Sequence, residues 1–225
     1  MTPQSATRPI ELDQKRIAEL LTPFIGPASL SDLQLSSIQV YLELLLKWNA
    51  KLNLTAIRDP EEAIARHFGE SLFAARQLFP TGPSRDTAID IGSGAGFPGL
   101  PLKLWNSSLE LTLIESNQRK ATFLREVIRA LDFDSASVTA ARAETVSLRG
   151  DLVTFRAVER FQQILPVACN LVRQGGRIAI LIGEAQVGLA QKTLPGVQWQ
   201  TPIPIPLSRN GRLLIGEVIH LKQSC

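Results

Sequence analysis

One glycine-rich segment constrains the fold of this chain more than any other. A short apolar run, 87–91, carries Asp90 near its end and is followed by Gly92, Gly94 and Gly96. The apolar run is typical of a buried parallel strand. The glycines let the backbone turn sharply and let a ligand approach it closely. The segment therefore predicts a strand, a ligand-binding loop and a helix in succession.

A second acid lies nineteen residues after Gly96, where the next expected strand ends at Glu115. In nucleotide-binding α/β folds, an acidic side chain at the end of this strand accepts hydrogen bonds from the ribose hydroxyls. The glycine spacing is G-x-G-x-G rather than the dinucleotide pattern G-x-G-x-x-G, and the Asp90 carboxylate would repel a pyrophosphate. S-adenosylmethionine carries no phosphate and has a cationic sulfonium and amino group. The electrostatics therefore favour S-adenosylmethionine over a nicotinamide dinucleotide as the cofactor.

The periodicity divides the chain into a helical N-terminal region, 1–80, and an alternating region, 81–225. In the first region we expect helices over 10–22, ended by Pro23, from 31 to about 51, and from 60 to about 79. In the second region strands alternate with helices, which predicts an α/β, doubly wound, mostly parallel sheet. The seven expected strands are 87–91, 110–115, 136–140, 151–155, 177–182, 197–202 and 212–221, and the helices are 98–106, 118–131, 159–172 and 184–193.

The end of the chain departs from this alternation, because no helix separates the last two expected strands. Asn210-Gly211 is a tight-turn signal, so these strands should pair as an antiparallel hairpin. Gln174-Gly175-Gly176 predicts a turn before the fifth strand. A Rossmann-like sheet that ends in an antiparallel hairpin is typical of class I S-adenosylmethionine-dependent methyltransferases, so we assign 81–225 to such a domain.

The composition limits the partners, metal sites and cellular location that can be expected of this protein. The 225 residues carry a net charge of +3, and 151–225 hold eight Lys or Arg against four acids, which is compatible with an anionic partner such as RNA. Two cysteines and two histidines, widely separated, indicate no metal site. The sequence shows neither a signal peptide nor a membrane-spanning run, so we expect a cytoplasmic protein. No exposed apolar stripe demands a partner, and we expect a monomer.

Several motifs give the chain, from about residue 38 onward, a specific resemblance. They are Trp48-Asn49 with Asn53-Leu54-Thr55, Arg58-Asp59-Pro60, Arg66-His67 with Ser71, Arg156-Ala157, and the glycine loop with its continuation Phe97-Pro98-Gly99-Leu100-Pro101-Leu102. In these the chain resembles the RsmG (GidB) 16S ribosomal RNA guanine-N7 methyltransferases. The glycine loop alone indicates a methyltransferase, and the other motifs make the resemblance specific.

The resemblance implies transfer of a methyl group from S-adenosylmethionine to N7 of a guanine, guanine 527, in 16S ribosomal RNA of the small subunit or an assembly intermediate. It implies cofactor contacts at Gly92, Phe97, Ala143, Glu144 and Arg156. Arg156 ends the fourth strand and could hold the methionine carboxylate or an RNA phosphate, which makes it the candidate catalytic residue. Together with the loop analysis, the expected cofactor-binding residues are Asp90, Gly92, Gly94, Gly96, Phe97, Glu115, Ala143, Glu144 and Arg156.

Three positions depart from the family pattern. Glu70 replaces the usual Asp before the serine of the Arg-His motif, and Phe155 replaces the serine before Arg156. Ile182 stands where the family has a lysine near the rim of the active site. These changes concern the side on which RNA would bind and leave the glycine loop intact.

Guanine N7 already has an in-plane lone pair, so its methylation requires proximity and alignment but no general base. The chain accordingly lacks an Asn-Pro-Pro-Tyr motif and a motif cysteine after the fourth strand. Charge placement gives the candidate RNA-binding residues Arg58, Arg66, His67, Arg119, Lys120, Arg160, Arg209 and Arg212, each of which could instead be a solvated or structural side chain.

Three other functions remain open. The same fold serves methyltransferases of small molecules or proteins, and methyl transfer to such substrates would identify one. A non-catalytic RNA-binding assembly factor would fail to bind the cofactor. A dehydrogenase would bind a nicotinamide dinucleotide.

Overall fold

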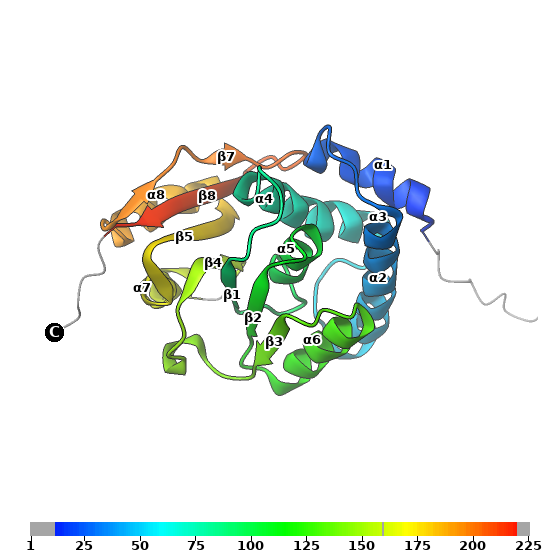
Figure 1. The fold of residues 1–225 in the computed structure, drawn as a ribbon, viewed down its shortest axis with the longest axis horizontal. Helices are drawn as coiled ribbons and strands as arrows, with labels where there is room; N and C mark the ends of the chain where they lie inside the picture. Colours follow the sequence, from blue (N-terminus) through cyan, green and yellow to red (C-terminus); the bar gives the residue numbers. More distant parts are fainter. Residues whose placement is uncertain (1–11, 159, 220–225) are drawn as a thin grey trace, which may run out of the picture.

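The computed structural model describes residues 12–158 and 160–219. Its centre is one mixed sheet with the strand order β3-β2-β1-β4-β5-β8-β6, in which β7 also pairs with β8. Strands β1 to β5 run parallel, and β8 is antiparallel to β5 (Figure 1). The strands are β1 (Thr87–Ile91), β2 (Glu110–Ile114), β3 (Ala136–Thr139), β4 (Gly150–Arg156), β5 (Val172–Gly183), β6 (Val197–Trp199), β7 (Ile203–Pro204) and β8 (Gly211–Val218).

Helices cover both faces of the sheet, which confirms the doubly wound fold. On one face α5 (Gly99–Trp105) and α6 (Gln118–Ala130) pack together with the N-terminal helices over Ala88 and Leu113. On the other, α7 (Phe161–Asn170) and α8 (Glu184–Thr193) pack over strand side chains such as Phe155 and Ile180. Alternate residues of the strands enter the two layers, as expected of a sheet buried on both sides.

The N-terminal helices are α1 (Gln14–Ile25) and α2 (Asp32–Leu52), and the side chains of the residues just before them, Asp13 and Ser31, cap their first turns. The prediction that Pro23 ends the first helix was wrong, because α1 continues through it. Only two helical residues follow the proline, Phe24 and Ile25, and both are buried in the core. The residues 10 and 11 of the expected helix lie outside the described ranges. Helix α2 packs against α6 at one end of the molecule (Figure 1).

The helix expected from 60 to about 79 is interrupted by a π-helical turn. It consists of α3 (Pro60–Ala63), the π-helical turn η1 (Ile64–Gly69) and α4 (Glu70–Leu78). Such wider turns are frequent at functional sites, and this one contains His67. Apolar spacing alone does not distinguish the π turn from a regular helix, so the sequence did not predict it.

The C-terminal strands differ in detail from the prediction. β6 and β8 pair antiparallel as expected, but Ile203 and Pro204 form the additional strand β7 against β8, so the sheet has eight strands and not seven. The turn before β8 is also wider than a two-residue Asn-Gly turn, with its left-handed residue at Leu207 (φ 58°).

The turn predicted at Gln174-Gly175-Gly176 is an irregularity within β5, where Gly175 has φ 75° and the register with β4 shifts. The helix expected over 159–172 is the shorter α7, since Val172 already belongs to β5. Among the residues described, no helix combines the length and apolar character needed to cross a bilayer.

Candidate functional site

A cavity of about 440 Å³ opens at the carboxyl ends of β1, β2 and β4. Its size lies within the range of small-molecule sites, and this edge of the sheet is where open α/β folds bind ligands. The glycine loop contributes Gly92 and Gly94, which both have a positive φ that favours glycine. The rest of the lining is Ile91, Ile114, Glu115, Ser116, Asn117, Lys120, Ala141, Arg142, Ala143, Glu144, Ala157, Val158, Arg160, Gln163 and Ile164.

Glu115 holds the loop that forms this cavity. Its Oε2 accepts a hydrogen bond from the Gly94 N–H at 2.9 Å, and its Oε1 accepts one from the Asn117 N–H at 2.7 Å. Asn117 in turn caps α6 by accepting from the Arg119 and Lys120 N–H groups. One buried carboxylate therefore fixes both the glycine loop and the start of α6, and lines the cavity between them.

The residues present fit S-adenosylmethionine. The cavity has apolar walls from side chains such as Ile91, Ile114 and Ile164 and carboxylates from Glu115 and Glu144. Apolar walls suit the adenine ring, and the carboxylates suit ribose hydroxyls and a cationic group. Along the described chain, no three or more His, Cys, Asp or Glu side chains come together in a way that could hold a metal ion.

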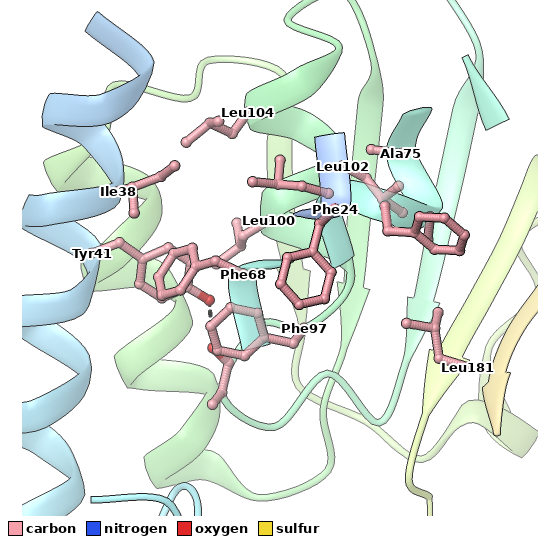
Figure 2. Close-up of a cluster of buried hydrophobic side chains, with 14 of the residues drawn as sticks. Phe24, Ile38, Tyr41, Phe68, Ala75, Phe97, Leu100, Leu102, Leu104 and Leu181 are labelled. Atoms are coloured by element: carbon pink, nitrogen blue, oxygen red, sulfur yellow. Dashed lines mark hydrogen bonds between the residues drawn. The ribbon is translucent and has the colours of Figure 1, made fainter. Parts of the chain in front are cut away.

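The other side of the glycine loop faces the N-terminal helices, as Figure 2 shows for Tyr41 and Phe97. The Tyr41 hydroxyl donates a hydrogen bond to the Ala95 carbonyl oxygen, and its ring stacks on Phe97 with centroids 5.2 Å apart. A Cβ at Gly96 would come within 2.3 Å of the Tyr41 hydroxyl oxygen. Gly96 and Phe97 were expected to contact the cofactor, but neither lines the cavity. Gly96 packs against Tyr41 of α2 and Leu100 of α5, and Phe97 packs against Tyr41 and against His67 and Phe68 of η1.

Asp90 lies beneath the loop, fully buried, and does not line the cavity either. Its carboxylate packs against Gly99, where an added Cβ would be 2.8 Å from Oδ2. Neither side-chain oxygen has a hydrogen-bond partner in the described part of the chain, nor does Thr154 Oγ1 at the paired position of β4. Burial raises the pKa of Asp90 to about 7. Asp90 therefore lies behind the glycine loop rather than in the cavity wall, and its contact with the cofactor stays a prediction.

Arg156 is the centre of a second polar cluster, at the end of β4. Its Nη1 donates to the Arg66 carbonyl oxygen at 2.8 Å and lies 3.5 Å from Glu70 Oε2, and its Nη2 donates to His67 Nδ1 at 2.8 Å. The guanidinium also lies over the Phe97 ring, 5.4 Å from its centroid. Only 15% of the Arg156 side chain is exposed. The π-helical turn η1 thus supplies most of the groups that hold this arginine.

The two hydrogen bonds of His67 fix its tautomer. Arg156 can only donate, so Nδ1 accepts and the ring proton is on Nε2, which donates to Thr55 Oγ1 at 2.7 Å. Burial, followed by the charges of Arg156 and Arg66, lowers the pKa of His67 to about 3. The imidazole is therefore neutral at physiological pH, and it stacks on Phe97 with centroids 4.9 Å apart.

The segment after α2 extends this chain of contacts. Asn49 accepts the Thr55 N–H at 3.0 Å and donates to the Ile57 carbonyl oxygen at 3.2 Å, and Thr55 Oγ1 also accepts the Ile57 N–H. A continuous set of hydrogen bonds therefore links Asn49, Thr55, His67 and Arg156. The Trp48-Asn49, Asn-Leu-Thr and Arg-His motifs meet here, although the sequence did not show that their side chains touch.

A second cavity of about 300 Å³ opens beside this cluster. It shares Ala157 and Val158 with the first cavity, so the two adjoin at the end of β4. Its walls are Arg66, Glu70, Arg156, Phe161, Leu181, Ile182, Gly183, Gln186, Ile205, Ser208, Asn210 and Gly211. Glu70 carries the compensating charge, with Oε1 2.8 Å from Arg66 Nε and Oε2 near Arg156.

The predicted cofactor residues therefore separate into two sets. Gly92, Gly94, Glu115, Ala143 and Glu144 line the first cavity, and their contact with the cofactor stays a prediction. The structure places Arg156 in the wall of the second cavity instead. The sequence did not single out Tyr41, Thr55 or Asn49 as site residues. Thr55 and Asn49 belong to the Asn-Leu-Thr and Trp-Asn motifs, and this membership was the only signal in the sequence.

Three of the eight predicted RNA-binding residues line the two cavities. Lys120 and Arg160 line the first, and Arg66 lines the second, with half of its side chain exposed. His67 is buried and has both ring nitrogens engaged, so it holds Arg156 and offers no surface to RNA. Its fixed position is that of a structural side chain.

The remaining candidates are Arg58, Arg119, Arg209 and Arg212. Arg58, Arg119 and Arg209 are exposed, and Arg58 donates to Asn53 Oδ1 at 3.1 Å. Arg212 pairs with Glu184 at 2.8 Å and is only 17% exposed, so its charge is largely neutralised. Arg212 is therefore the least suited of the four to bind RNA.

Comparison with solved structures supports the fold. A ribosomal protein L11 methylase from Lactobacillus delbrueckii subsp. bulgaricus superposes with a TM-score of 0.57 at 13% identity, covering 69% of this chain and 80% of that protein. TYW2 from M. jannaschii, in complex with AdoMet, gives a TM-score of 0.53 at 14% identity, covering 66% and 74%. At these identities the likeness concerns the fold alone.

Comparison with sequence relatives gives the family. A ribosomal RNA small subunit methyltransferase G from Chloroflexus aggregans is 41% identical over 174 residues, which are 73% of this chain and 72% of the relative. One from Xanthomonas campestris pv. campestris (strain B100) is 38% identical over 173 residues, which are 72% and 79% of the two chains. The family model described as GidB, rRNA small subunit methyltransferase G, matches residues 34–193. The resemblance is confirmed, and the chain belongs to the rRNA small subunit methyltransferase G family.

Proposed function

We propose that this protein transfers a methyl group from S-adenosylmethionine to N7 of a guanine, guanine 527, in 16S ribosomal RNA. The family name supports a methyltransferase that acts on ribosomal RNA. The observation that carries the proposal is the junction of two cavities at Ala157 and Val158, one suited to the cofactor and one walled by Arg156. A methyl donor in the first cavity and an acceptor in the second would meet at that junction.

The residues of the first cavity would bind and orient the cofactor, which supplies an electrophilic methyl group when bound. Glu115 and Glu144 would accept hydrogen bonds from the ribose hydroxyls and the adenine edge, and the backbone of Gly92 and Gly94 would approach the methionine end. The Cβ of an alanine at Gly92 would lie 3.0 Å from Val158 Cγ1, which shows how little space this wall leaves. Binding of AdoMet and MeSAdo by structural neighbours of the same fold supports the same cofactor here.

The residues of the second cavity suit a guanine whose N7 must stay unprotonated and accessible. Three N–H bonds of the Arg156 guanidinium have partners in the described structure, which leaves two of its five for a ligand. An arginine that donates to guanine O6 leaves the N7 lone pair free, and it would fix the plane of the base. The Glu70 carboxylate beside it would stabilise the positive charge that the ring gains on methylation.

No group in this cavity needs to remove a proton. His67 has the low pKa of a buried imidazole and both ring nitrogens in hydrogen bonds, so it holds Arg156 in place rather than acting as a base. Catalysis would rest on alignment of the two cavities, on the exclusion of water by the buried cluster and on charge compensation.

Radiolabelled methyl transfer tests the proposal. Small ribosomal subunits lacking this modification would be compared with naked 16S RNA and with a pool of small molecules and proteins as acceptors. We expect label at guanine N7 of the ribosomal RNA, and the preferred form identifies the physiological substrate. Cofactor binding by calorimetry without label on any RNA would contradict the proposed substrate, and label on a small molecule or protein would replace it.

A further inference from the structure

A basic groove lies between the end of α2 and the start of α6. It is a hollow of about 250 Å³ lined by Lys51, Leu52, Asn53, Asn117, Arg119 and Lys120. The two segments are far apart in the sequence, and the packing of α2 on α6 brings them together (Figure 1). Three of the six lining side chains are cationic, two are amides, and none is acidic.

The charge of the basic groove is not neutralised within the described structure. Lys51, Arg119 and Lys120 take part in no ion pair there, whereas Arg66, Arg156 and Arg212 elsewhere on the molecule are each paired with a glutamate. A fourth cation stands at the rim, because Arg58 donates to Asn53 Oδ1 at 3.1 Å. Converging cations without counter-charges attract an anion with several oxygen acceptors, and phosphate has this chemistry.

The basic groove adjoins the first cavity, which we call the cofactor cavity; the second cavity is called the Arg156 cavity. Asn117 and Lys120 line both the groove and the cofactor cavity, just as Ala157 and Val158 line both the cofactor cavity and the Arg156 cavity. The three hollows therefore follow one another along the sheet edge, with the cofactor cavity in the middle. An RNA strand whose base enters the Arg156 cavity can cross the mouth of the cofactor cavity and bring a neighbouring phosphate to the groove.

We propose that the basic groove binds a backbone phosphate of the substrate RNA, on the side of the cofactor cavity opposite the Arg156 cavity. This inference rests on the proposed function and adds a second point of attachment for the RNA. Phosphate contacts fix the position and direction of a strand without reading its sequence. The groove thus sets the course of the strand, while the Arg156 cavity receives the base.

The test compares Lys51→Gln/Arg119→Gln with Lys15→Gln/Arg125→Gln. The control pair removes the same charges from exposed residues of α1 and α6 outside the groove. The affinity for transcribed, unmethylated 16S RNA is measured over a range of salt concentrations. Each lost phosphate contact makes the slope of log K against log salt shallower by roughly 0.7 to 0.9, so we expect a change of about 0.7 to 0.9 for the groove variant and less for the control. Cofactor affinity and melting temperature should match between the two variants.

Two further arms make the result decisive. In the wild type, RNA should protect Lys51 but not Lys15 from chemical acetylation, which requires no substitution. Saturable binding of inorganic phosphate or a mononucleotide that the groove variant loses, with an unchanged RNA slope, would show a small-anion site and overturn the RNA assignment. Equal RNA slopes in both variants, with methyl transfer to RNA intact, would overturn the groove inference alone. A wild type that neither binds nor methylates RNA would overturn the proposed function as well.

Discussion

The two adjoining cavities at the sheet edge are built in different ways. The cofactor cavity is formed by turns that directly follow the strands, and its loop is held by one nearby carboxylate, Glu115. The Arg156 cavity depends on contacts between segments about 90 positions apart, such as Arg156 with His67. The first is local architecture common to this fold, and the second requires the N-terminal helices to be in place.

This difference predicts that the two cavities can be disabled separately. A substitution at Glu115 should weaken cofactor binding, while the rate of methyl transfer at saturating cofactor stays close to that of the wild type. A substitution at Arg156 should slow methyl transfer, while the affinity for the cofactor stays unchanged.

Substitution of Arg156 by lysine should have the largest effect. Lysine is a point charge and cannot hold the Arg66 carbonyl, His67 and Glu70 together as the planar guanidinium does. We expect methyl transfer to fall by about 100-fold or more while the dissociation constant of the cofactor, measured by calorimetry, hardly changes. Arg173→Lys, in an exposed pair with Asp151, is the control. A loss of cofactor affinity equal to the loss of rate would place Arg156 on the cofactor instead.

Substitution of Glu115 by glutamine should have the converse effect. The amide can accept only through one atom, so one of the Gly94 and Asn117 N–H groups loses its charge-assisted hydrogen bond. We expect cofactor binding to weaken by about 1.5 to 3 kcal/mol, with the rate at saturating cofactor close to that of the wild type. Glu110 is exposed at the start of β2, the strand that Glu115 follows, and Glu110→Gln should leave the cofactor affinity and the rate unchanged. If Glu115→Gln bound cofactor normally, the proposed role of this carboxylate would be wrong.

Tyr41 connects the N-terminal helices to the glycine loop, and its substitution by phenylalanine should affect stability. The buried Ala95 carbonyl oxygen loses its donor, which should lower the free energy of unfolding by about 1 to 2 kcal/mol. Denaturant unfolding measures this, with Thr145→Val as the control because its hydroxyl bonds a carbonyl at the surface. If the two variants lost the same free energy of unfolding, the buried hydrogen bond from Tyr41 would contribute no more to stability than an exposed one.

The smallest expected effect concerns pH. The pKa of His67 is lowered to about 3, from 6.5 in the unfolded chain. The neutral imidazole therefore contributes its full stability above pH 6.5, and this contribution is lost as the pH falls below that value. The pKa of Asp90 is raised to about 7, from 3.8 in the unfolded chain. The protonated carboxyl group therefore contributes its full stability below pH 3.8, and this contribution is lost as the pH rises above that value.

Relative to wild type, His67→Gln should therefore gain about 1 kcal/mol of stability as the pH falls from about 6.5 to 5.5. Asp90→Asn should gain a similar amount as the pH rises over the same interval. Chemical denaturation at several pH values measures both differences. Parallel trends in the two variants would show that at least one of these groups titrates in the opposite sense.

The sequence predicted the local part of the site. A strand, a glycine loop and an acid in register identify the cofactor cavity, because adjacent parallel strands bring their carboxyl ends together. Asp90, Gly96 and Phe97 flank the loop but do not line this cavity, because Asp90 packs against Gly99 of α5 and the other two pack against Tyr41 of α2. Which side a loop residue faces depends on the layer packed behind it, and the spacing of the motif carries no information about that layer.

The Arg156 cluster was predicted only in part. The sequence selected Arg66, His67 and Arg156 separately, but it gave His67 a role at the surface. The contact between His67 and Arg156 arises from the π-helical turn and from the packing of η1 beside the glycine loop. Neither feature follows from apolar periodicity, so the fixed histidine tautomer and the role of Thr55 appear only in three dimensions.

A crystal structure with bound S-adenosylmethionine tests the separation of the two cavities most directly. We expect the adenosine between Glu115 and Glu144, the methionine end beside Gly92 and Gly94, and the methyl group directed past Ala157 and Val158 toward Arg156. A cofactor whose methionine carboxylate binds Arg156, or whose methyl group points away from the Arg156 cavity, would contradict this expectation.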